Sequence, residues 1–285
     1  MAQVDLHLHT NYSDGTLSPS ELVGLCAQRG LRVIALTDHD STEGVREAME
    51  AAWAFPALEL IPGIELSTDV PGSEIHVLGY FVDREDASFQ RALARLREGR
   101  EDRARGIVEK LSSVGVEVSW ERVKELSGGG AIGRPHIAQA LVEAGYVEYP
   151  REAFDKYLGR NGPAYVGRVK LTPNEAVEML VANGALPVLA HPTFFTEDAE
   201  KLKATLVDLK RSGLVGMEVH YGGYTSEQVD ELAGVAAELG IVPCGGSDYH
   251  ASGNPGEPEP GTAGPPMDTV DALRELKSAV RATRA

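Results

Sequence analysis

Short apolar runs recur along this 285-residue chain, and most of them end in a histidine or lie beside a carboxylate. Residues 4–9 end in His7 and His9, and residues 33–38 are followed by His39. Later runs carry further histidines and carboxylates, which are Glu65, His76, His191, Asp248 and His250. Short runs of this composition, bounded by turn residues, indicate strands. With Asp14, the set contains six histidines and three carboxylates, as a site for several metal ions requires.

The apolar runs alternate with helical patterns, which indicates an α/β protein with a parallel sheet. Two helix starts are marked by capping boxes with proline at the first helical position, at residues 18–21 and 172–175. The expected strands lie near residues 4–9, 32–37, 58–66, 74–81, 186–190, 214–219 and 241–246. Since a complete barrel of this type has eight strands, the predicted fold is a distorted seven-stranded (β/α)7 barrel with an inserted helical subdomain.

The insertion is expected where the alternation breaks, between residues 99 and 166. Helical patterns cover residues 87–112, 120–126, 135–144 and 151–158. The barrel would then comprise residues 1–98 and 167–285, and the subdomain of residues 99–166 would cross its top and contribute to substrate binding. Arginines alternate with glutamates over residues 91–105, which favours a solvated, ion-paired helix face over a phosphate-binding strip.

The formal charge of −16 argues against broad binding to the nucleic-acid backbone, so no long duplex is expected as a partner. The two cysteines, Cys26 and Cys244, are far apart, so they predict neither a disulfide framework nor a thiolate metal site. The start of the chain has no signal-peptide pattern, and no apolar run approaches the roughly 20 residues of a membrane span. We therefore expect a cytoplasmic monomer without membrane contacts.

Strand geometry gives the first histidine motif its meaning. Side chains two residues apart share a face of a strand, so Asp5, His7 and His9 point into the barrel. Buried polar groups are costly unless they are paired or bind metal. A hydrogen-bonded core histidine explains any single case, but not the recurrence at several strand ends. Imidazole and carboxylate ligands without thiolate suit two or three divalent metal ions, with manganese favoured and iron or zinc as alternatives.

The motifs, taken together and in order, resemble those of the polymerase-and-histidinol-phosphatase (PHP) family. They are residues 7–10, 12–15, 37–39, 63–65, 190–192 and 246–250. The resemblance covers the chain apart from the insertion. It is greatest to stand-alone bacterial members that act on nucleoside 3′,5′-bisphosphates and on short RNA 5′ ends. It implies a distorted seven-stranded barrel with up to three metal ions.

The resemblance also implies a set of metal ligands, which would be the catalytic residues. A first metal would be held by His7, His9, Glu65 and Asp248. A second would share Glu65 and add His76 and His191, and a third would use Asp14, His39 and His250. Asp5, Asp38 and Asp40 are candidates for fixing imidazole tautomers, with a turn or cap role as an equal alternative for Asp40.

Substrate contacts are expected from the loop at residues 128–136, which leads into a helix with Pro135 at its first position, where free N–H groups attract phosphate. The resemblance implies that Arg134 and His136 contact a second phosphate of the substrate, with a plain capped helix as the alternative. Arg168 and Lys170 are further candidates. His220 follows an apolar run and would bind substrate or protonate the leaving oxygen, although a packed rim histidine explains it equally well.

These expectations define a metal-dependent phosphohydrolase. It would remove the 3′-phosphate of nucleoside 3′,5′-bisphosphates through a hydroxide that bridges two metals, and would also trim short RNA from the 5′ end. Histidinol-phosphate phosphatase is the alternative within phosphate chemistry, but the cationic loop suits its amine substrate poorly. An amidohydrolase also begins with a His-x-His strand, but those enzymes typically use a bridging lysine that no strand end offers here.

Overall fold

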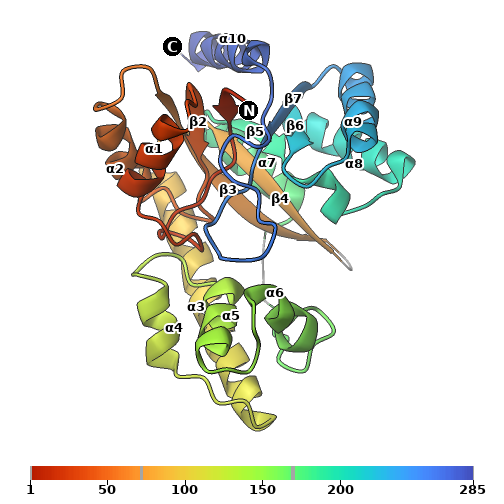
Figure 1. Ribbon diagram of the computed structural model, residues 1–285. Helices are drawn as coiled ribbons and strands as arrows, with labels where there is room; N and C mark the ends of the chain where they lie inside the picture. Colours follow the sequence, from red (N-terminus) through yellow and green to blue (C-terminus); the bar gives the residue numbers. More distant parts are fainter. Residues whose placement is uncertain (1, 71–72, 168–170, 285) are drawn as a thin grey trace.

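A computed structural model describes residues 2–70, 73–167 and 171–284 (Figure 1). Among these residues a single seven-stranded sheet is formed, with the strands in sequence order. They are β1 (Val4–Asp5), β2 (Val33–Leu36), β3 (Glu59–Val70), β4 (Ser73–Tyr80), β5 (Leu186–Leu189), β6 (Gly216–Tyr221) and β7 (Val242–Gly246). The predicted distorted seven-stranded barrel is confirmed.

The sheet closes almost completely, because the chain beyond β1 pairs with β7 and with the residues that follow it. Leu6 N donates to Gly245 O at 3.1 Å, and Asp248 N donates to His7 O at 2.9 Å. These bonds hold the two histidines that follow β1 against the segment that carries Asp248. Residues from the two ends of the sequence therefore meet at one point of the barrel rim.

The expectation of an entirely parallel sheet is wrong at β4. This strand pairs antiparallel with both β3 and β5, while the other neighbouring pairs are parallel. The reason is the short connection, since only residues 71–72 separate β3 from β4. A parallel pair needs a crossover of a dozen or more residues, whereas a hairpin needs about two.

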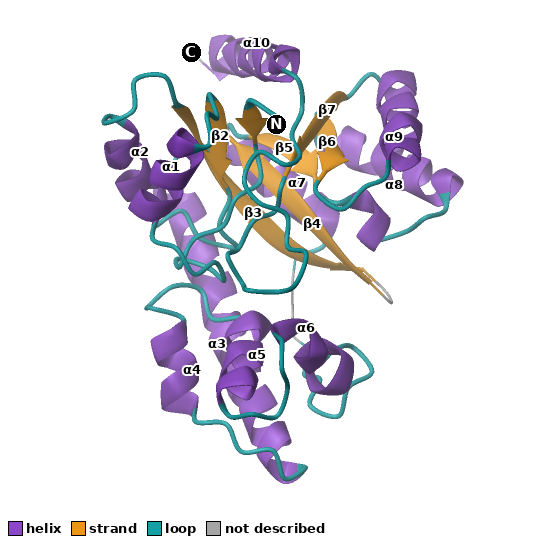
Figure 2. Cartoon of the chain, in the orientation of Figure 1, coloured by secondary structure: helices purple, strands orange, loops and turns teal. Residues whose placement is uncertain are grey.

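Helices cover the outside of the sheet (Figure 2). They are α1 (Pro19–Gln28), α2 (Val45–Ala52), α7 (Pro173–Asn183), α8 (Ala199–Ser212), α9 (Ser226–Leu239) and α10 (Met267–Arg284). The predicted capping boxes are present at Ser18 and Thr172. Val270 and Leu273 of α10 belong to the same buried hydrophobic cluster as Val4 of β1, and α10 covers the end of the barrel away from the insertion (Figure 1).

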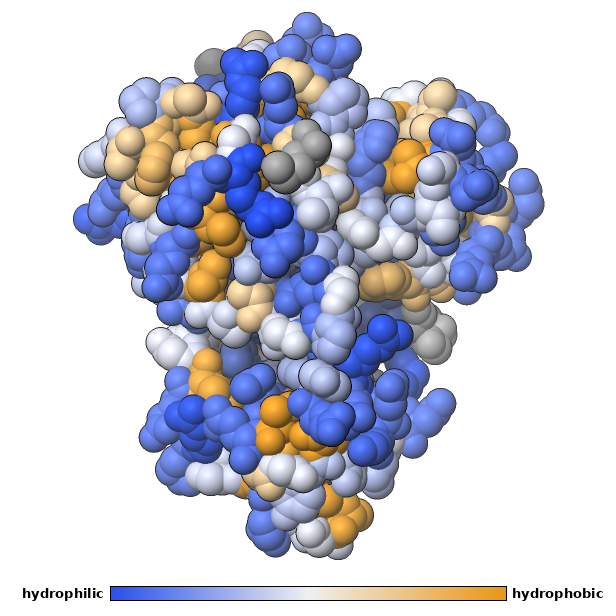
Figure 3. Space-filling model, viewed as in Figure 1, coloured by the Kyte–Doolittle hydropathy of each residue, from blue (hydrophilic) through white to orange (hydrophobic). Residues whose placement is uncertain are grey.

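The inserted helices form a second body below the barrel, and the molecule narrows between the two (Figure 3). They are α4 (Trp120–Leu126), α5 (Arg134–Glu143), α6 (Pro150–Ala153) and a π-helical turn (Phe154–Leu158). Helix α3 (Ala87–Ser113) belongs to both bodies, since Phe89 and Leu93 pack in the barrel core while Ile107 and Leu111 pack among the inserted helices. Residue 99, where we expected the insertion to begin, therefore lies inside a continuous helix.

No helix in the described ranges is both long and apolar enough to cross a membrane.

Candidate metal centre

Four side chains converge where the two chain ends meet. His7 Nε2 lies 3.3 Å from Glu65 Oε2 and 3.2 Å from Asp248 Oδ1. His9 Nε2 lies 3.3 Å and 3.2 Å from the same two oxygens. The four ligand atoms all lie within 4.8 Å of one another. Two imidazole nitrogens and two carboxylate oxygens thus surround one point, and they are the four residues that the family resemblance implies for a first metal.

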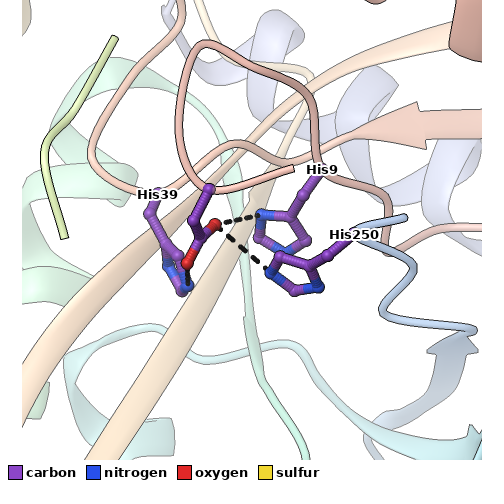
Figure 4. Close-up of side chains that lie close together, drawn as sticks. His9, His39 and His250 are labelled. Atoms are coloured by element: carbon purple, nitrogen blue, oxygen red, sulfur yellow. Dashed lines mark ion pairs between the residues drawn. The ribbon is translucent and has the colours of Figure 1, made fainter. Parts of the chain in front are cut away.

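A second group surrounds the carboxylate of Asp14. Asp14 Oδ1 lies 3.2 Å from His250 Nε2 and 3.7 Å from His9 Nδ1, and Asp14 Oδ2 lies 3.6 Å from His39 Nε2. Figure 4 shows the rings of His9, His39 and His250 turned toward one another around a carboxylate. The three residues implied for a third metal are therefore together, and His9 joins them.

Glu65 connects the groups. Its Oε1 lies 2.8 Å from His76 Nδ1 and 3.1 Å from His191 Nε2, while its Oε2 lies 3.0 Å from His39 Nδ1. The structure thus places His76 and His191 on one oxygen of the shared glutamate. All nine residues implied as ligands lie in one continuous cluster at the barrel rim.

The burial of this cluster tests whether metal ions fit. Buried ligand atoms lack a hydrogen-bond partner, namely His7 Nε2, His9 Nε2, Asp14 Oδ1, His39 Nδ1 and Glu65 Oε2. Burial alone raises the pKa of Glu65, but the adjacent imidazoles outweigh it and hold that pKa well below its usual value. Asp14 behaves in the same way. Ionised carboxylates and imidazoles without hydrogen bonds are costly to bury, and divalent cations would satisfy them.

Two residues that the sequence analysis missed orient the cluster from outside. Glu218 on β6 is fully buried, its Oε1 lies 3.1 Å from His7 Nδ1, and its Oε2 accepts from His191 N at 2.8 Å. Tyr221 donates its hydroxyl to Asp248 Oδ2 at 2.8 Å. The sequence held one signal for Glu218, because it is the single charged residue within the apolar run of residues 214–219.

Strained backbone accompanies two of the implied ligands. His191 has φ of 22° and Asp248 has φ of 57°, in a region that residues with a side chain rarely adopt. Such strain clusters at functional sites, where the surrounding structure holds it in place. Here, the backbone N–H of His191 donates to the Glu218 carboxylate, and the backbone N–H of Asp248 donates to His7 O.

The three aspartates proposed to fix imidazole tautomers make other contacts. Asp5 accepts the backbone N–H groups of Ser247 and Gly261, each at 2.9 Å. Asp38 accepts from Thr10 and Ser13, and Asp40 accepts from Ser67 N and from Arg100. Through these contacts the three aspartates position the loops that carry the ligands. The carboxylate that lies against an imidazole nitrogen, and can fix its tautomer, is that of Glu218.

An arginine-lined cavity of about 110 Å³, the arginine pocket, opens beside the cluster. Arg100, Arg103 and Arg134 line it together with Asp14, His39 and His76. The predicted solvated face of residues 91–105 is therefore wrong for Arg100 and Arg103, although Arg105 pairs with Glu101 as expected. The physical reason is helical spacing, since residues three apart on α3 share the face that turns toward the barrel.

The remaining candidates differ in position. Arg134 lies in the arginine pocket and donates to Glu74 at 3.0 Å. His136 is buried and caps α5, with its Nδ1 accepting from Gly133 N at 3.0 Å. His220 lies at a bulge of β6, and within the described residues it makes no contact with the cluster. Arg168 and Lys170 lie outside the described residues.

Comparisons with known proteins agree with this geometry. The model of the PHP domain matches residues 5–158. The chain is 31% identical to a 3′,5′-nucleoside bisphosphate phosphatase from Chromobacterium violaceum over 98% of both chains. It is 36% identical to a 5′-3′ exoribonuclease from Haemophilus influenzae, over 86% of this chain and 89% of that one. A crystal structure from Bifidobacterium adolescentis, described as a metal-dependent phosphoesterase, superposes with a TM-score of 0.87 at 30% identity, covering 96% of each chain.

The barrel and its His/carboxylate cluster thus define a phosphoesterase that uses divalent metal ions. The chain belongs to the PHP family.

Proposed function

We propose that this enzyme removes the 3′-phosphate of nucleoside 3′,5′-bisphosphates and trims short RNA from its 5′ end. The observation that carries the proposal is the arginine pocket, which shares Asp14, His39 and His76 with the cluster. A substrate with one phosphoryl group at the cluster can place a second phosphate among these arginines. The bisphosphate phosphatase and the exoribonuclease to which the chain is similar support this substrate class.

In this proposal the nine clustered residues hold two or three divalent ions, and manganese is the metal we propose. When bound, such ions neutralise charge on a phosphoryl group and lower the pKa of a water nucleophile. Glu65 is the shared ligand, since its two oxygens face five histidines, namely His7, His9, His39, His76 and His191. Tyr221 and Glu218 fix the orientation of Asp248 and His7.

The arginines select the substrate. A guanidinium offers five N–H donors, so the bond between Arg134 and Glu74 leaves donors for a phosphate. Arg100 is held by Asp40 and by Ser67, each at 2.6 Å, which fixes its plane at the wall of the pocket. Arg103 is fixed through its Nε, which donates to Val166 O at 2.7 Å. Fixed cations cost little further ordering when a phosphate binds.

Histidinol-phosphate phosphatase fits less well, because its substrate presents an ammonium group where the pocket presents guanidinium groups. The test is phosphate release by the purified protein with manganese, from adenosine 3′,5′-bisphosphate and from histidinol phosphate side by side. We expect turnover of the bisphosphate to be the faster of the two. Absence of release from the bisphosphate, or faster release from histidinol phosphate, contradicts the proposal.

A further inference from the structure

A second and wider cavity, of about 450 Å³, also reaches the cluster. It meets the arginine pocket at Asp14, Pro135 and Phe154, which line both cavities. It also touches His250, another member of the cluster. A molecule whose phosphoryl group lies at the cluster can therefore extend into both cavities at once.

The two cavities differ in charge. Among the described residues lining the wider one, the single guanidinium is that of Arg122. Three of its five N–H donors are bonded to carboxylates, because Nε and Nη2 bond Glu143 at 2.7 and 2.9 Å and Nη1 bonds Glu125 at 2.8 Å. His136 also lines this cavity, and burial lowers its pKa, which keeps the ring neutral near pH 7. The charge of the single described guanidinium is thus balanced by two glutamates, which makes the wider cavity a poorer phosphate site than the arginine pocket.

Its walls suit a flat, uncharged group instead. Phe154, Leu126 and Pro135 supply apolar surface. Phe154 also begins the π-helical turn, a rare structure that is frequent at functional sites. The cavity volume falls within the range of roughly 300–1,000 Å³ that is usual for small-molecule sites.

Among the described residues, two polar groups that line this cavity lack a side-chain hydrogen bond. The Oδ1 of Asn11 is buried without a hydrogen bond, and in the described part of the chain none engages the carboxamide of Gln139. The carboxamide of Asn254 differs, because its Oδ1 accepts from Arg151 N at 3.2 Å and its Nδ2 donates to Ser252. A ligand edge with both a donor and an acceptor would satisfy Asn11 and the half-buried Gln139. Leaving the buried Oδ1 of Asn11 unpaired is costly.

We infer that the wider cavity binds the nucleobase of the substrate, with Gln139 and Asn11 contacting the base edge and Phe154 its face. The inference rests on the proposed function and extends it. The reacting phosphate lies at the cluster, the second phosphate lies among the arginines, and the base fills the wider cavity, whose single described guanidinium is paired with two glutamates. The enzyme would then distinguish a nucleotide from a sugar bisphosphate that has no base.

Binding measurements on the manganese-loaded protein test this inference without turnover. The probes are adenosine 5′-monophosphate and ribose 5-phosphate, which carries a hydroxyl where the nucleotide carries its base, and the method is isothermal titration calorimetry. We expect wild-type protein to bind the nucleotide roughly tenfold or more tightly than the sugar phosphate, because stacking of a base on an aromatic ring makes a contribution of this size in nucleic-acid-binding proteins. Gln139→Trp fills the cavity and should abolish this difference. Gln139→Leu, of similar size, should weaken nucleotide binding about three- to tenfold by loss of a hydrogen bond, and leave sugar-phosphate binding unchanged.

The matched control is Val207→Trp, which adds the same ring at a position 39% exposed on α8 and should change neither affinity. Equal wild-type affinities for the two probes overturn the inference, as does a Gln139→Leu variant that binds both probes like wild type. Should Gln139→Trp fail to fold, Gln139→Leu decides. Phosphate release from adenosine 3′,5′-bisphosphate, measured on the same wild-type sample, tests the proposed function separately. If the protein prefers the nucleotide but releases no phosphate, the proposed reaction is refuted and the base site is not.

Discussion

Glu218 and His7, both fully buried, are joined by a contact of 3.1 Å between Oε1 and Nδ1. The other ring nitrogen of His7, Nε2, faces Glu65 and Asp248. A carboxylate that accepts the Nδ1 proton leaves Nε2 unprotonated and free to bind a metal. Glu218 therefore fixes both the tautomer and the orientation of an implied ligand, although it lies on a different strand.

Replacing Glu218 with glutamine tests this relationship. The amide keeps the size but removes the charge, so metal affinity should fall about 10–100-fold, as is typical when the partner of a metal-ligating histidine is lost. Isothermal titration calorimetry with the metal ion measures the change in affinity. Glu227→Gln, at an exposed position on α9, is the control and should bind metal normally. Unchanged affinity in Glu218→Gln contradicts the role given to this residue.

Removal of metal should lower the thermal stability, because it leaves buried carboxylates and imidazoles without partners. A ligand present at 100 times its dissociation constant stabilises a protein by about 2.7 kcal/mol for each site. Differential scanning calorimetry with and without a chelator measures the shift in melting temperature. In Asp248→Asn the shift should be smaller. Identical melting of wild-type protein with and without the chelator argues against the metal cluster.

Arg134→Ala should impair hydrolysis of a nucleoside bisphosphate much more than hydrolysis of a simple aryl phosphate, because only the former presents a second phosphate. Loss of hydrogen bonds to a charged group costs roughly 1.5–3 kcal/mol, or about 10–100-fold in kcat/KM. Steady-state kinetics on both substrates measure the difference. Arg105→Ala, which removes an exposed arginine paired with Glu101, should leave both rates unchanged. An equal loss of kcat/KM on both substrates would show that Arg134 does not bind the second phosphate.

Gly130→Ala should disturb the contact between the insertion and the loop that carries Asp14. A Cβ atom at Gly130 would lie 2.6 Å from Asn11 O and 2.7 Å from Tyr12 Cα, closer than real contacts allow. We expect lower activity and lower stability, measured by kinetics and urea unfolding. At Gly99 within α3, nothing lies within 4 Å of the added atom. Gly99→Ala should therefore stabilise the protein by about 0.5–1 kcal/mol and keep its activity; equal effects of the two changes would be inconsistent with the close approach.

His136 should make stability depend on pH. Burial lowers its pKa in the folded protein below the usual value of 6.5, so the unfolded chain binds the proton more readily. The stabilisation by the neutral ring is complete above about pH 6.5 and is lost as the pH falls toward the folded-state pKa. Glutamine can still accept from Gly133 N but does not titrate. Urea unfolding between pH 5 and 8 should show wild-type protein losing stability relative to His136→Gln on acidification, and a constant difference would contradict this assignment.

Much of the fold could be predicted because helix ends and strands depend on residues that are close together in the sequence. Capping boxes such as that of Ser18 and Glu21 involve side chains three positions apart, and the strands are visible as short apolar runs. The antiparallel pairing of β3 and β4 was also available, since the expected strands at residues 58–66 and 74–81 leave only seven residues between them, too few for a parallel crossover. It was missed because the alternation of strands and helices was extended across it. The orientation of Arg100 was missed because charge alternation does not show which face of a helix is covered.

By itself, the sequence determined which side chains stand at strand ends and therefore which of them can reach the barrel rim, since strand periodicity is local. Only the tertiary structure decided which atoms meet there. Glu218 and His7 lie 211 positions apart, and their contact depends on how β6 packs beside the closing strands. The two cavities likewise arise where the insertion lies against the rim, because their walls come from segments whose contact no local pattern encodes.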